Sequence, residues 1–200
     1  MEEKVAAALI GVVVGWIISQ FTEVIKDRRN RRKKIEAVYT EATDIEAWLS
    51  RMLKQTEYSL QLALLKEQVT SVPSDLHVFM FEEHFHEICM HMPRDIRIGF
   101  TDYYGSVVHI NQIIEQIKNI IDSDCENNEK LIIKLEALYS MVFSTRFKIN
   151  TLLHMKSGDM SKLKGAAKKL DQESVESLLK VRDDAYRLGA QKIHERHYAE

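Results

Sequence analysis

The sequence predicts an all-α protein in which a single N-terminal transmembrane helix is followed by a cytoplasmic helical bundle that forms an oligomer. Two Pro and seven Gly in 200 residues leave little material for the many turns of a β architecture. An uncharged N-terminal stretch runs directly into a basic segment. Beyond that segment, apolar residues recur at alternating spacings of three and four, as they do along the buried seam of packed helices.

Composition divides the chain into one domain with an appendage. Its length suits a single core, and its formal net charge is -2. Nevertheless, Lys26 to Lys34 contain seven basic residues and one acidic residue. Cys89 and Cys125 lack CxxC spacing, which favours free thiols in a reducing compartment. We therefore expect a transmembrane segment at 1–25, a basic juxtamembrane run at 26–34 and a cytoplasmic helical domain at 35–200.

The first element is the N-terminal span. Val5 to Phe21 contain no charged residue, and continued to Ile25 the segment approaches the ~20 residues that cross a hydrocarbon core. The chain begins Met-Glu-Glu-Lys without the basic region that opens a signal peptide, so we expect the span to be retained. Because the basic run follows the span, the positive-inside rule predicts a single-pass protein of the inner cell membrane with its C-terminal domain in the cytoplasm. A buried core helix is the alternative.

Small residues recur at every fourth position of this span. They are Ala7, Gly11, Gly15 and Ser19. This spacing places them on one helical face, where they allow neighbouring backbones to approach closely. We therefore expect membrane packing between spans and a homo-oligomer, and the alternative is a monomeric anchor.

The next element is a long helix with a heptad seam. The seam consists of Ile35, Val38, Ala42, Ile45, Leu49 and Met52. No Pro or Gly interrupts the chain until the Ser71–Asp75 segment, which is expected to end the helix. An oligomeric stalk and a bundle helix facing its own core both fit this pattern.

Further helices are expected in the remaining chain, at 74–90, 94–121, 131–152, 160–169 and 174–197. The second and third of these carry long apolar seams and are joined by a polar loop. They are therefore expected to form an antiparallel pair.

A group of basic residues suggests a phosphate site at one end of this pair. If the loop reverses the chain, the end of the later helix lies near the beginning of the earlier one. The helix N-terminus near Arg94 would add backbone donors suited to phosphate. The candidate ligand-binding residues are Arg94, Arg97, Arg146, His154 and Lys156. Scattered surface charge is the alternative.

No catalytic motif is complete. The densest group of potential metal ligands is FEEHFHEICMHM, in which His86-Glu87 is followed by His91, five residues on, whereas a metalloprotease helix needs two His four apart. A metal site there would also need a ligand from elsewhere, so an amphipathic helix with solvated His and Glu is the favoured interpretation. No nucleophile elbow or phosphate-binding loop is present. We expect no enzymatic activity, no metal and no cofactor.

The span Val5 to Phe21, the basic run Lys26 to Lys34 and the heptads that follow together resemble a family of small membrane effectors of type III CRISPR antiphage defence. That family is gated by cyclic tetra-adenylate through a helical domain. The resemblance covers the architecture of the whole chain, and no binding residue is carried over from it. It implies a cyclic oligonucleotide ligand, a homo-oligomer, and disruption of the lipid membrane during phage infection.

Two other functional classes compete with this one. A membrane-tethered helical adaptor that binds another protein, with no small ligand, fits the same architecture. A metal-dependent enzyme centred on His84 to His91 fits it less well. The acidic balance of the chain outside the basic run argues against a DNA or RNA polymer as partner.

Overall fold

The computed structural model describes the backbone of residues 2–123, 128–154 and 161–199. Side chains in these ranges are described except at 2–10, 161–169, 171, 190–192, 194 and 196–199. Within the described residues all regular structure is helical, which confirms the predicted fold class. The helices are α1 (Glu2–Leu64), α2 (Phe79–Ile88), the short 3-10 helix η1 (Cys89–His91), α3 (Arg94–Asp122), α4 (Asn128–His154) and α5 (Ser161–Ala199).

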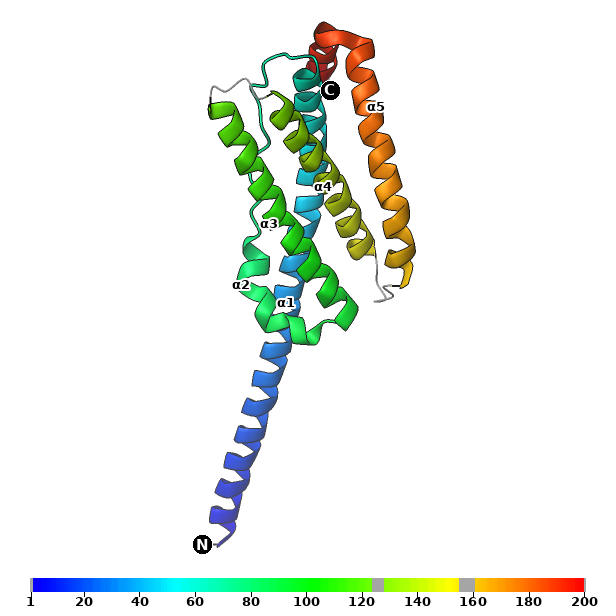
Figure 1. The fold of residues 1–200 in the computed structure, drawn as a ribbon. Coiled ribbons are helices and arrows are strands. Elements are labelled where there is room, and N and C mark those ends of the chain that lie inside the picture. Colours follow the sequence, from blue (N-terminus) through cyan, green and yellow to red (C-terminus); the bar gives the residue numbers. More distant parts are fainter. Residues whose placement is uncertain (1, 124–127, 155–160, 200) are drawn as a thin grey trace.

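Helix α1 packs in the bundle along its C-terminal part and is exposed along its N-terminal part. Its N-terminal part projects from one end of the bundle, and the C-terminal part of α5 lies toward the opposite end (Figure 1). Every side chain from 11 to 30 is exposed. We call residues 2–30 the arm.

The heptad seam of α1 is buried inside its own chain. Val38, Ala42, Ile45, Leu49 and Met52 are each at most 4% exposed, and α1 packs against α2, α4 and α5. The seam is therefore the core face of a bundle helix rather than the contact face of a stalk. Burying apolar side chains of this size is the main favourable term that holds such a helix in place.

Helix α1 ends at Leu64, before the Ser71–Asp75 segment where its end was predicted. Lys66 adopts a left-handed conformation with φ 59°. Its N–H donates to the Ala63 carbonyl at 3.1 Å, and the Glu67 N–H donates to the Leu62 carbonyl at 2.9 Å. This pair of bonds satisfies the last carbonyls of the helix, as in the Schellman motif, without the usual glycine.

Helices α3 and α4 pack against each other as an antiparallel pair, as predicted. Near the beginning of α3, Gly99 lies against Leu152 near the end of α4. A Cβ atom at Gly99 would lie only 2.7 Å from Leu152 Cδ1. The beginning of α3 and the end of α4 therefore meet at the end of the bundle from which the arm projects (Figure 1).

The last part of the chain differs from its prediction. The expected break between 169 and 174 is absent, and helical structure continues from Ser161 to a kink at Gly189. Gly189 has φ 72°, a conformation that glycine adopts without steric cost. Val181, Ala185 and Ile193 of α5 are buried.

Helix α2 is fixed by contacts with α1 and α3. The Glu41 carboxylate of α1 accepts hydrogen bonds from the backbone N–H groups of Met80 and Phe81, at 2.7 and 2.8 Å. These amides belong to the first turn of α2, where no helical carbonyl is available. On the other side, Phe81 stacks on Tyr104 of α3 with ring centroids 4.6 Å apart, and the Tyr104 hydroxyl donates to Glu82. Glu41 thus acts as a cap supplied by a distant part of the sequence.

The structure contradicts the predicted location in the inner membrane. Among the residues that the structure describes, no helix is long and apolar enough to cross a membrane. Side chains are described from Gly11 onward, and eighteen residues counted from there take in Glu23, Lys26, Asp27 and Arg28. In the expected packing face, a Cβ atom added at Gly11 or Gly15 would have no neighbouring atom within 4 Å. Ser19 is exposed, and the side chain of Ala7 lies outside the described residues.

The Glu41 cap can be tested by substitution. Glu41→Ala removes the acceptor of two backbone N–H groups and should lower the free energy of unfolding by about 1–2 kcal/mol. Amide hydrogen exchange at Met80 and Phe81 should accelerate as well. Glu36→Ala is the matched control, because Glu36 is an exposed carboxylate of the same helix. Equal effects of the two substitutions on denaturant unfolding and on these amides would contradict the assignment of Glu41 as a cap.

Candidate anion-binding site

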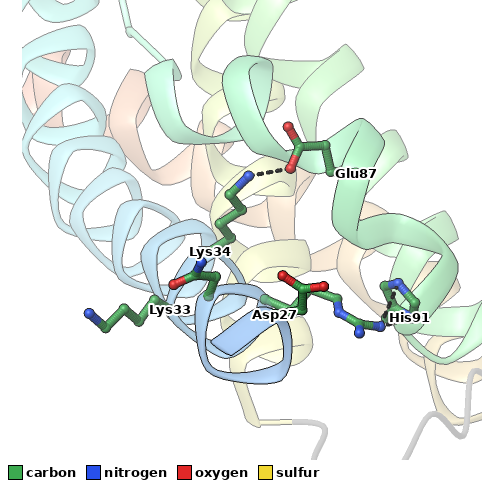
Figure 2. A pocket seen from close by; sticks show the side chains of 7 residues that line it. Asp27, Lys33, Lys34, Glu87 and His91 are labelled. Carbon is green, nitrogen blue, oxygen red and sulfur yellow. Dashed lines mark hydrogen bonds and ion pairs between the residues drawn. The ribbon is translucent and has the colours of Figure 1, made fainter. Parts of the chain in front are cut away.

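A solvent-open depression lies where the arm enters the bundle. It forms between α1 on one side and α2 and η1 on the other, with a volume of about 690 Å³ (Figure 2). Its lining residues are Asp27, Asn30, Arg31, Lys33, Lys34, Glu87 and His91. We call it the junction pocket.

One ion pair crosses the junction pocket. The Lys34 ammonium of α1 donates to a carboxylate oxygen of Glu87 in the last turn of α2. The side chains are 31% and 48% exposed, so water still reaches both groups. The hydrogen bond and the positive charge of Lys34 hold the pKa of the Glu87 carboxyl below its usual range. In Figure 2 the side chain of Lys33 points away from Glu87 and His91.

A second contact crosses the pocket from Arg31 to His91. A terminal guanidinium nitrogen of Arg31 lies 3.0 Å from Nε2 and 3.3 Å from Nδ1 of the His91 ring. A guanidinium only donates hydrogen bonds, so the ring is the acceptor in this contact. His91 thus supplies no negative charge to Arg31, and the carboxylate that shares this side of the pocket with Arg31 is Asp27, one turn earlier on α1.

The α1 side of the pocket is built by helical spacing. Asp27, Arg31 and Lys34 are four and three residues apart, which places them on one face of α1. That face meets α2 and η1, and Glu41 and Tyr104 hold the first turn of α2 in position. The result is a guanidinium and an ammonium side by side at an open surface. Such a pair suits phosphate oxygens, because both groups form charge-assisted hydrogen bonds with them.

Three of the residues predicted to bind phosphate lie at this same end of the bundle. Arg94 is exposed and Arg97 is half-buried in the first turn of α3, while His154 is exposed at the end of α4. Arg97 donates to the carbonyl of Cys89 at 3.5 Å and lies 3.6 Å from the sulfur of Met90. It therefore also ties α3 to η1.

The other two predicted residues are not part of this group. Arg146 lies further along α4, where its guanidinium donates to Glu46 of α1 at 2.9 Å. Its charge is engaged in a contact between α1 and α4 within the bundle. Lys156 lies outside the described residues.

Sequence reasoning missed the residues that line the junction pocket. Arg31 and Lys34 were assigned to a membrane interface, and Glu87 and His91 were considered only as potential metal ligands. The spacing of Arg31 and Lys34 signals a shared face, but nothing in the sequence indicates that α2 lies opposite. Within the part of the chain that the structure describes, no group of three or more His, Cys, Asp or Glu side chains is arranged to hold a metal ion.

No protein family model, curated protein or solved structure matches the chain. The geometry of the basic end of the bundle is therefore the basis for a functional proposal.

The Lys34–Glu87 pair can be tested by titration. Lys34→Gln should raise the pKa of Glu87 toward the ordinary value of about 4.3, because it removes the charge that favours the carboxylate. Since that pKa is lowered in the folded state, the pair stabilises the fold above the pKa of the unfolded chain and loses this effect as pH falls through the folded value. Carboxyl carbon NMR measures the shift, and Lys33→Gln is the control. An equal response to both substitutions would show that the ion pair is not formed in solution.

Proposed function

We propose that this protein is a ligand-gated effector whose helical bundle senses an anionic cyclic oligonucleotide at its basic end. The observation that carries the proposal is the continuity of α1. The same helix contains the buried seam and the exposed arm, and Arg31 and Lys34 lie where one becomes the other. A ligand bound at this point touches both the sensing bundle and the element that would act on a target.

The chemistry of the basic end supports an anionic ligand of moderate size. Arg31 and Lys34 come from α1, Arg94 and Arg97 from α3, and His154 from α4. Basic side chains spread over several helices suit a ligand with several phosphates better than a single phosphate ion. The net charge of the chain is -2, which is unfavourable for binding a long nucleic acid along its surface.

The resemblance of the apolar stretch Val5 to Phe21, the basic run and the heptads that follow to type III CRISPR effectors suggests the ligand class. Cyclic oligoadenylates carry one negative charge for each phosphodiester, and cyclic tetra-adenylate is the ligand that the resemblance implies. Antiphage defence is the corresponding biological role. The ligand can shift the protein only by preferring one arrangement, and each tenfold preference corresponds to about 1.4 kcal/mol.

Assembly into a homo-oligomer is part of the same proposal. The arm exposes large apolar side chains on all of its faces. They include Val12, Val13, Val14, Trp16, Ile17, Ile18 and Phe21. A helix that is apolar all round is stable when other helices surround it, so arms from several copies would cover one another. Ligand binding at the base of each arm could then alter how the arms pack.

A protein adaptor without a small ligand is the second candidate function. The exposed arm supports it, because a partner helix could cover the same apolar surface. Trp48 on the outer face of α1 adds a second surface, since it is 52% exposed and has the Arg51 guanidinium 5.4 Å from its ring centre. Aromatic and arginine side chains are frequent energetic centres of protein interfaces.

Calorimetric titration of the full chain with cyclic tri-, tetra- and hexa-adenylate tests the sensor proposal. At least one of these ligands should bind, and Arg97→Ala or His154→Ala should weaken binding by roughly five- to thirtyfold, the effect of losing one hydrogen bond to a charged group. Lys130→Ala is the control, because Lys130 is an exposed cation in the first turn of α4, at the other end of that helix. Circular dichroism verifies that each variant is folded.

Absence of binding of all three ligands to the folded chain would overturn the sensor proposal and favour the adaptor. Equal weakening by Lys130→Ala would show that the ligand responds to overall charge and not to the basic end of the bundle.

A further inference from the structure

The junction pocket already contains an anionic group within reach of one of its cations. The Glu87 carboxylate is hydrogen-bonded to the Lys34 ammonium. A phosphate oxygen that entered the pocket would seek the same ammonium, because carboxylate and phosphate oxygens accept the same charge-assisted hydrogen bonds. The two anions would therefore compete for Lys34.

The geometry makes Glu87 easy to displace. Its side chain is 48% exposed, so water can solvate the carboxylate as soon as it leaves Lys34. Exposed ion pairs are weak for this reason. Glu87 also lies in the last turn of α2, whereas the Glu41 cap and the Tyr104 stack hold the first turn. Next to Glu87, Ile88 is fully buried and Arg97 donates to the Cys89 carbonyl, so the Glu87 side chain can leave Lys34 while the backbone of α2 stays in place.

Arg31 differs from Lys34 in its partner. It contacts the ring of His91, and the imidazole accepts without supplying negative charge. In the junction pocket, Glu87 thus offsets the charge of Lys34, whereas His91 does not offset the charge of Arg31. An entering anion meets Arg31 beside the Asp27 carboxylate, whereas at Lys34 it must take the place of Glu87.

We infer that Glu87 is a built-in competitor that occupies the phosphate subsite at Lys34 until an anionic ligand displaces it. The inference rests on the proposed function and names how that site is regulated. Binding of a phosphate-bearing ligand at Lys34 and formation of the Lys34–Glu87 ion pair are then mutually exclusive. Because coupling between two equilibria is reciprocal, whatever weakens the Lys34–Glu87 pair strengthens the binding of the ligand.

The test uses tripolyphosphate as probe and the full chain as wild type, Glu87→Gln and Glu129→Gln. Glutamine keeps the size of the side chain while removing its charge. Glu87→Gln should bind tripolyphosphate about three- to fivefold more tightly than the wild type, in keeping with the modest strength of an exposed ion pair. Glu129→Gln removes an equal charge from an exposed position in the first turn of α4, at the other end of the bundle, so its affinity should change by less than about 1.5-fold at 150 mM salt, where distant charges are screened.

Amide hydrogen exchange of α2 in the absence of probe gives a second measurement. Glu87→Gln should accelerate exchange near Ile88 more than at Met80, because it removes a contact between the last turn of α2 and α1. Faster exchange with unchanged affinity would mean that Glu87 is a structural contact alone and would overturn the inference.

Two further results would also contradict it. Equal tightening by Glu87→Gln and Glu129→Gln would show that affinity depends only on the net charge of the chain. Failure of tripolyphosphate to bind even Glu87→Gln would show that Lys34 does not form a phosphate subsite. Neither result decides the proposed function. That proposal is tested separately, by titration of the chain and its Arg97 and His154 variants with cyclic oligoadenylates.

Discussion

Burial of the α1 seam is the constraint on which the rest of the structure depends. Val38 and Leu49 are at most 1% exposed, so α1 cannot shift along or rotate against its neighbours without exposing apolar surface. The position of Glu41 follows from that registration, and Glu41 in turn determines where α2 begins. Once α2 is placed, Glu87 lies within reach of Lys34. A hydrophobic seam in the middle of α1 thus determines the position of the polar junction pocket at the base of the arm.

The contacts of the bundle core and those of the junction pocket differ in strength. Phe100 is fully buried and packs edge-on against Tyr39 at 5.1 Å, and the full burial of an aromatic side chain contributes several times more than an exposed ion pair. The bundle core is therefore the rigid part, and the Lys34–Glu87 and Arg31–His91 contacts are the adjustable part. Regulatory contacts are usually drawn from the less stable parts of a protein, because they must open without unfolding the rest.

Local patterns in the sequence predicted much of the fold but little of the site. The apolar spacing predicted the buried face of α1 and the antiparallel pairing of α3 with α4, since both depend on one repeating period. Glu41 and Phe81 are forty residues apart, and Lys34 and Glu87 are fifty-three apart, so no local pattern reveals their contacts. Arg146 was grouped with the phosphate ligands because it is basic and lies late in its helix, whereas its position on α4 directs it to Glu46. The apolar N-terminal stretch suggested a membrane span, and the described part of the helix does not support that location.

The central claim is that an anionic ligand changes the packing of α1 against α2 at the base of the arm. Spin labels at Arg29→Cys on the arm and Glu83→Cys on α2, in a chain with Cys89→Ser and Cys125→Ser, allow the distance between the two helices to be measured by pulsed electron resonance. Without ligand we expect one narrow distance distribution. Saturating cyclic tetra-adenylate should shift or broaden it, because Glu87 leaves Lys34. A distribution that stays unchanged while the ligand is bound would contradict the claim.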